Sequence, residues 1–154
     1  MNTKAEIALK QFDKDLNAFL IACNDLEELG TWNVRKRGPM ATYFEADLFT
    51  VALQVMSADG VFERAEAEVL NAMFSTSYTP RELSQMYHSS NPVIDDYFSK
   101  TSQDALGMLS GLDANLADAY RGLLLDACEI ISLSDGVAEK SERELIAQLQ
   151  EVLR

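Results

Sequence analysis

Histidine and cysteine are scarce in this chain of 154 residues, which holds one histidine and two cysteines. A structural zinc site takes four cysteine or histidine ligands, and helical di-metal enzymes add histidines or further glutamates, so neither pattern fits. His88 has no cysteine, serine or second histidine at a catalytic spacing, and we expect it at a helix end or on the surface. Cys23 and Cys128 fall on apolar helix faces, which predicts buried thiols rather than a disulfide or a metal site.

Basic residues are also few, and long apolar runs are missing. The 13 lysines and arginines stand against 25 aspartates and glutamates, a formal net charge of −12. This balance disfavours general binding to nucleic acid or to an anionic membrane surface, because both require clustered positive charge. No apolar stretch approaches the ~20 residues of a membrane span, and the segment from Met1 to Lys10 lacks the apolar core of a signal peptide. We therefore expect a cytoplasmic protein with no nucleic-acid partner and no membrane insertion.

Catalytic motifs are lacking as well. The sequence contains no phosphate-cradling glycine-rich loop and no serine or cysteine nucleophile motif. We expect no organic cofactor and no enzymatic activity. Carboxylate pairs can still perform acid–base chemistry, so a metal-dependent phosphoester hydrolase is kept as the less favoured alternative.

What the sequence does contain is helical periodicity. No segment alternates apolar and polar residues for long enough to demand a strand. The pattern predicts an all-α fold, a compact bundle of about seven or eight helices in a single domain over residues 1–154. The expected parts are an amino-terminal helix (1–30), a basic linker (31–42), a first repeat unit (43–76), middle helices (77–112) and a second repeat unit (113–154).

The amino-terminal helix, expected from Lys4 to Leu29, carries a heptad seam of apolar residues. We predict that Phe12, Leu16 and Phe19 on this seam are buried, either against the core of the same chain or across a homodimer contact.

The linker holds a basic cluster in an otherwise acidic chain. The cluster is Arg35, Lys36 and Arg37, and Gly38-Pro39 stops a helix after it. It is a solvated loop, a patch that docks on the acidic surface, or an anion-binding patch. Trp32 is either a core residue or an exposed contact residue.

One segment of the chain occurs twice. Residues 57–70 recur, in register and without a gap, as residues 133–146. Each copy reads as helix, sharp turn and helix, with Gly60 and Gly136 forming the turns because glycine adopts the left-handed conformation without steric cost. Two copies are too few for a solenoid, so the pattern predicts a duplicated helix–turn–helix unit.

The acidic residues of the two turns allow two interpretations. Glu66 and Glu142 each provide half of a capping box and place favourable charge at a helix amino terminus. Alternatively, if the two units pack about a pseudo-two-fold axis, the carboxylates converge and hold a hard divalent cation, calcium or magnesium. The residues of this four-carboxylate site are Asp59, Glu66, Asp135 and Glu142.

A pair of calcium-binding EF-hands is excluded, although a glutamate follows each turn glycine by six residues as in that motif. The earlier ligand positions hold Val55 and Ser57 in one copy and Ile131 and Leu133 in the other, where acidic or amide side chains belong. These residues instead continue the apolar stripe of the preceding helix.

The duplicated Asp-Gly-x-x-x-x-x-Glu motif at the end of an apolar helix, in an acidic all-helical chain, resembles the TerB-like (tellurite resistance protein B) family from Asp47 to Leu149. The resemblance implies an all-helical fold, a candidate divalent-metal site at the four carboxylates, and a non-enzymatic stress-response or scaffold role with a protein partner. The chain departs from the family in Glu63 and Glu139 at the cap positions and in its long amino-terminal helix. The alternative is a metal-independent protein–protein interaction domain.

Overall fold

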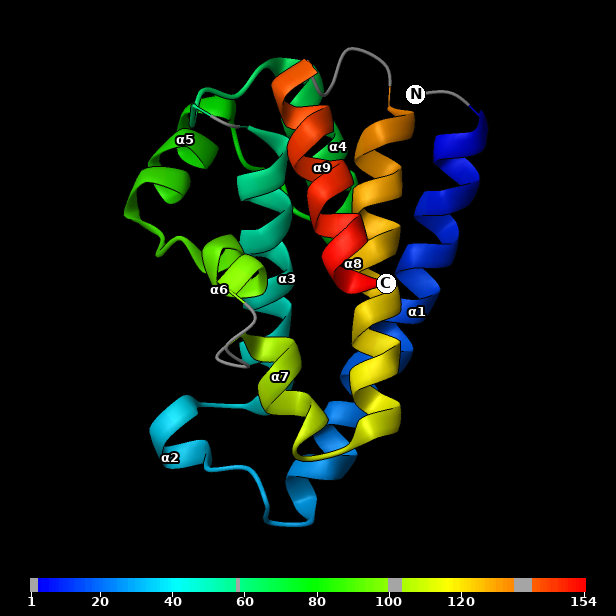
Figure 1. Ribbon diagram of the computed structural model, residues 1–154, viewed down its shortest axis with the longest axis vertical. Coiled ribbons are helices and arrows are strands. Elements are labelled where there is room, and N and C mark those ends of the chain that lie inside the picture. Colours follow the sequence, from blue (N-terminus) through cyan, green and yellow to red (C-terminus); the bar gives the residue numbers. More distant parts are fainter. Residues whose placement is uncertain (1–2, 58, 100–103, 135–139) are drawn as a thin grey trace.

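The computed structural model describes residues 3–57, 59–99, 104–134 and 140–154, with the backbone alone for 140–142. Within these ranges the chain forms helices and no strands (Figure 1), which confirms the all-α prediction. The described ranges hold one helix more than the upper expected number, because α2 is a single extra turn. The helices are α1 (Thr3–Glu28), α2 (Val34–Arg37), α3 (Met40–Met56), α4 (Arg64–Phe74), α5 (Pro80–Ser89), α6 (Val93–Ser99), α7 (Ala105–Ser110), α8 (Ala114–Leu133) and α9 (Lys140–Leu153).

Three long helices, α1, α3 and α8, build the centre of the molecule (Figure 1). Helix α1 packs along α8 and also touches α3, while α7 and α9 cover other parts of α8. Val55 of α3 and Ile131 of α8 are fully buried. The helix before each Asp-Gly therefore lies in the core, in keeping with the apolar stripe in its sequence.

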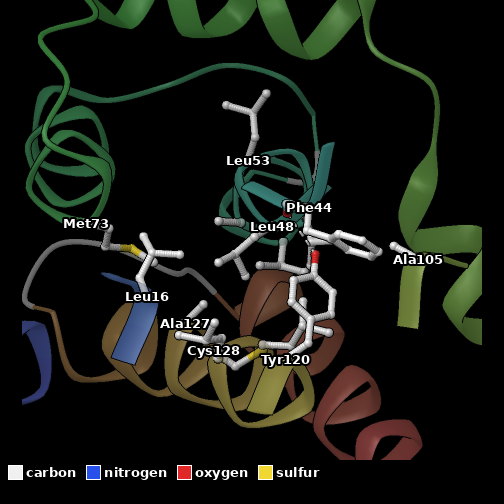
Figure 2. Close-up of a cluster of buried hydrophobic side chains, with 14 of the residues drawn as sticks. Leu16, Phe44, Leu48, Leu53, Met73, Ala105, Tyr120, Ala127 and Cys128 are labelled. Carbon is white, nitrogen blue, oxygen red and sulfur yellow. Dashed lines mark hydrogen bonds between the residues drawn. The ribbon is translucent and has the colours of Figure 1, made fainter. Parts of the chain in front are cut away.

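Helix α1 is part of this core. Phe12, Leu16 and Phe19 are buried within the single chain, as the heptad seam predicted. The ring of Phe19 lies 5.2 Å from that of Tyr120 on α8 and 6.1 Å from that of Phe44 on α3, measured between centroids. Figure 2 shows Phe44 and Tyr120 beside each other, with Leu16 in the same cluster of buried side chains. The homodimer contact remains a prediction, because burial of the seam does not require it.

Local capping explains where the helices begin. Thr79 and Asp113 cap α5 and α8, since each side-chain oxygen accepts a backbone N–H from the first turn. Helix α3 has no such cap of its own, because Pro39 precedes it. Its first N–H, on Met40, is instead bound at 2.7 Å by a carboxylate oxygen of Glu27 on α1.

The range 31–42, expected as a linker, contains α2 and the start of α3. Trp32 is only 6 % exposed, so it is a core residue and not an exposed contact residue. Its indole N–H donates to the carbonyl oxygen of Gly38 at 2.8 Å, and the Arg37 guanidinium lies 5.7 Å from its ring centroid. This aromatic contact fixes the end of α2 against the bundle.

None of the helices in the described ranges is both long and apolar enough to cross a membrane. Both cysteines are free and buried, as predicted, and burial raises the pKa of each thiol to about 12. For Cys23 the nearby charge of Glu27 contributes to this rise of the pKa as well.

Candidate functional site

The first Asp-Gly turn is built from a short network at the carboxyl end of α3. The Ser57 hydroxyl donates to Asp59 Oδ1 at 3.0 Å and accepts the Gly60 N–H at 3.0 Å. The same carboxylate oxygen accepts the Val61 N–H at 2.9 Å. Ser57 and Val61 therefore hold the Asp59 carboxylate in one orientation, and the Gly60 N–H in turn fixes the Ser57 hydroxyl.

Gly60 is required in this turn for two reasons. Its φ of +78° lies in the left-handed region, as the sequence predicted for the turn glycine. A Cβ atom at this position would also lie 2.6 Å from the Tyr87 ring and 2.7 Å from the His88 ring, both on α5. The Ser84 hydroxyl, one turn earlier on α5, donates to the Gly60 carbonyl oxygen at 2.6 Å. Helix α5 therefore braces the turn directly, and His88 lies in its last turn.

The Asp59 side chain is exposed and is held in its ionised form. The Val61 N–H lowers the pKa of this carboxyl most, followed by the Ser57 hydroxyl, and the charge of His88 lowers it slightly further. A fixed, exposed carboxylate of this kind is a suitable ligand for a hard cation.

Glu66 has a defined structural contact. It lies in the first turn of α4, is only 7 % exposed, and its Oε1 accepts the Glu63 N–H at 2.7 Å. This bond is the glutamate half of a capping box, which was one of the two interpretations of Glu66 from the sequence. The carboxylate thus contributes to the start of α4.

The predicted second turn falls in a part of the chain that the structure does not describe. Asp135 and Gly136, and the side chain of Glu142, lie outside the described residues. Among the residues that are described, no group of three or more histidine, cysteine, aspartate or glutamate side chains is arranged to hold a metal ion. The four-carboxylate site therefore stays a prediction.

The directions of α3 and α8 determine where the chain enters the two Asp-Gly sequences. Helices α3 and α8 run side by side in the same direction, so their carboxyl ends lie at the same end of the molecule (Figure 1). Contacts near the two starts agree with this direction, since Tyr120 early in α8 packs on Phe44 early in α3. The Asp-Gly sequence follows each of these carboxyl ends.

A second carboxylate, whose role the sequence did not reveal, lies half-buried between three helices. Asp47 of α3 accepts hydrogen bonds on Oδ2 from Tyr97 of α6 at 2.7 Å and from Tyr120 of α8 at 2.5 Å. Burial raises the pKa of Asp47, although the two phenol hydroxyls oppose the rise. The signal for it was an aspartate within the apolar stripe of α3, between Phe44 and Val51.

The three interpretations of the basic cluster remain predictions. Arg35, Lys36 and Arg37 make up most of α2 and are exposed. The Arg37 guanidinium rests over the rings of Trp32 and Tyr43, at 5.7 and 6.0 Å from their centroids. The positive charge of Arg37 is therefore partly satisfied by the chain's own aromatic rings. Arg35 and Lys36 belong to the same exposed turn.

Fold and turn together define an acidic, all-helical bundle in which a fixed Asp-Gly turn follows a core helix. The family model of the tellurite resistance protein TerB matches residues 45–154, which include both Asp-Gly sequences. The chain therefore belongs to the TerB family, as the resemblance implied, and this family is in general non-enzymatic. Helices α1 and α2 precede the matched region. Neither the curated proteins nor the solved structures compared with the chain gave a match.

Proposed function

We propose that this chain is a cytoplasmic, non-enzymatic TerB-family module of tellurite resistance or a related stress response, and that it binds calcium or magnesium at the four-carboxylate site. The observation that carries the proposal is the parallel arrangement of α3 and α8, with both carboxyl ends at one end of the molecule. Each of these ends leads into an Asp-Gly sequence.

The geometry of Asp59 supports a cation as the ligand. Its carboxylate is exposed and oriented by Ser57 and Val61, so little ordering remains to be done when an ion binds. The formal net charge of −12 attracts cations to the surface in general.

Calorimetric titration of calcium and then magnesium into chelator-treated protein tests the proposal. Wild type should bind at least one ion and should melt at a higher temperature in millimolar calcium, because the ion binds the folded state preferentially. The double variant Asp59→Asn, Asp135→Asn should lose this response. A matched control is Asp13→Asn, Asp25→Asn, which removes two exposed carboxylates of α1 and should keep it. A wild-type melting temperature indifferent to both ions would reject the cation.

A metal-independent interaction domain is the second candidate, and the Glu66 contact favours it. The bond from the Glu63 N–H to Glu66 accounts for that carboxylate without any ion. If this candidate is right, Glu66→Gln should keep most of the capping, and calcium should stabilise neither the variant nor the wild type. A calcium-induced stabilisation that Glu66→Gln abolishes would instead assign Glu66 to the cation.

A further inference from the structure

The outer face of the α1–α8 pair is hollowed along most of its length. Three hollows of about 490, 370 and 500 Å³ lie between the two helices. The first and second share Asp126, and the second and third share Ala22 and Leu116. They therefore follow one another along the two helices and are here together called the α1–α8 groove. It extends along α8 from Asp113 to Leu133, roughly 30 Å at 1.5 Å per residue.

The floor of the groove is apolar and is formed largely by small side chains. Small residues line its middle, and they allow another backbone to approach closely, as small residues do wherever helices pack tightly. Larger apolar side chains stand at its two ends. Ile7 of α1 is 64 % exposed and lines the first hollow, and Leu29, directly after α1, is 74 % exposed and lines the third. The small lining residues are Ala8, Ala18, Ala22, Ala119 and Gly122.

The walls of the groove are acidic. Lys4 is the one basic residue that lines it in the described part of the chain. Burial raises the pKa of Asp126, and the charges of Asp15 and Glu129 raise it further, so like charges crowd the centre of the groove. The acidic lining residues are Asp15, Asp25, Asp113, Asp126 and Glu129.

We propose that the α1–α8 groove is the docking site for a basic amphipathic helix of a partner protein. A helix of about 20 residues matches the length of the groove. Its small apolar face would rest on the alanine floor, and lysines or arginines on both sides would reach the acidic walls. Such a partner relieves the repulsion around Asp126 instead of adding to it.

A second copy of the chain fits the groove poorly. Each copy has a formal net charge of −12, and its own α1 would bring Asp15 and Asp25 toward the walls of the other. Like charges at an interface suppress association. Docking in the groove needs no bound cation, so an experiment in chelator tests it separately from the four-carboxylate site.

Fluorescence anisotropy with a synthetic peptide tests the docking site. The probe is a labelled helix of about 20 residues with alanine and leucine on one face and lysines beside them. The comparison peptide replaces every lysine by glutamate. The full chain, kept in chelator, should bind the lysine peptide and not the glutamate peptide. The affinity should fall as salt rises, because the wall charges become screened.

Gly122→Gln separates docking in the groove from general attraction to an acidic protein. Gly122 has open space beyond it, and glutamine is a better helix former, so the variant should melt no lower than wild type. Its side chain fills the floor without changing the charge and should weaken peptide binding about tenfold, which corresponds to about 1.4 kcal/mol. Ala72→Gln, on the exposed face of α4, is the matched control and should bind as wild type does.

The walls are tested in the same way. Asp126→Asn, Glu129→Gln should weaken binding and flatten its salt dependence, whereas Glu144→Gln, Glu151→Gln on the exposed face of α9 removes the same charge and should change binding little. Failure of the lysine peptide to bind at low salt would overturn the proposal. So would equal binding by Gly122→Gln and wild type. Sedimentation that shows a wild-type dimer, lost in Gly122→Gln, would assign the groove to a second copy instead.

Discussion

Asp47 and Asp59 belong to the same helix–turn–helix unit, yet their surroundings are opposite. Asp47 lies between α3, α6 and α8 and is held by two tyrosines far away in the sequence. Asp59 is exposed and is held by groups two residues away on either side. Burial raises the pKa of the first, and local hydrogen bonds lower the pKa of the second.

The difference teaches how a carboxylate acquires its role. Asp47 connects three helices because its partners come from Tyr97 and Tyr120, so it works as a structural contact inside the bundle. Asp59 is oriented by its own turn, so its position survives without long-range partners and its charge stays available to solvent. The following predictions test this contrast, starting with the largest effect.

Gly60→Ala tests whether the Asp59 turn is as rigid as its contacts indicate. The substitution places a Cβ at a positive φ and against the rings of Tyr87 and His88. We expect the free energy of unfolding to fall by about 3 kcal/mol in urea titrations. Gly30→Ala is the matched control, since Gly30 has a φ of +84° but open space around it, and should cost about 1 kcal/mol. Equal losses would show that α5 does not brace the turn.

Tyr120→Phe tests the buried side of the contrast. The change removes a buried hydroxyl that donates to the half-buried Asp47 carboxylate, and we expect a loss of about 2 kcal/mol in the free energy of unfolding. Tyr78→Phe is the control, because the described residues provide no hydrogen bond to that hydroxyl, and it should cost much less. If the two variants are equally stable, Asp47 does not connect the helices in the way we describe.

The pH dependence of stability should have opposite signs at the two aspartates. For Asp59, whose pKa lies below its ordinary value of 3.8, the carboxylate stabilises the fold above that value, and the contribution is lost as the pH falls through the lowered pKa. For Asp47, whose pKa is raised, the native state holds its proton longer, so stability is lost as the pH rises above 3.8.

Urea titrations of wild type, Asp59→Asn and Asp47→Asn across this pH range measure both contributions. The advantage of wild type over Asp59→Asn should grow as the pH rises, and its advantage over Asp47→Asn should shrink. Two differences that change in the same direction would remove the contrast between the two residues.

The sequence predicted the features that depend on residues close to one another in the chain. Apolar spacing gave the helices and the burial of Phe12, Leu16 and Phe19, and the caps at Thr79 and Asp113 follow from residue type alone. The turn glycine and the capping role of Glu66 belong to the same class, because their partners lie within a few residues. The duplication of the unit remains a reading of the sequence.

What the sequence did not reveal depends on partners far along the chain. Asp47 is hydrogen-bonded to Tyr97 and Tyr120, which lie 50 and 73 residues further along the chain. The apolar periodicity of a helix does not indicate which other helix will bring a hydroxyl to that carboxylate. The packing of α5 on Gly60 has the same origin, since the Ser84 hydroxyl reaches Gly60 across 24 residues. The four-carboxylate site needs a long-range contact too, between the two copies.

The bond from the Met40 N–H to Glu27 has a consequence for where this domain begins. The first turn of α3 relies on a carboxylate from α1, and Phe44 and Tyr120 rely on the ring of Phe19. The matched family region starts at residue 45, after all of α1. The boundary drawn by the family match therefore cuts through the hydrophobic core, so we expect a fragment that begins at residue 45 to fold less stably than the whole chain.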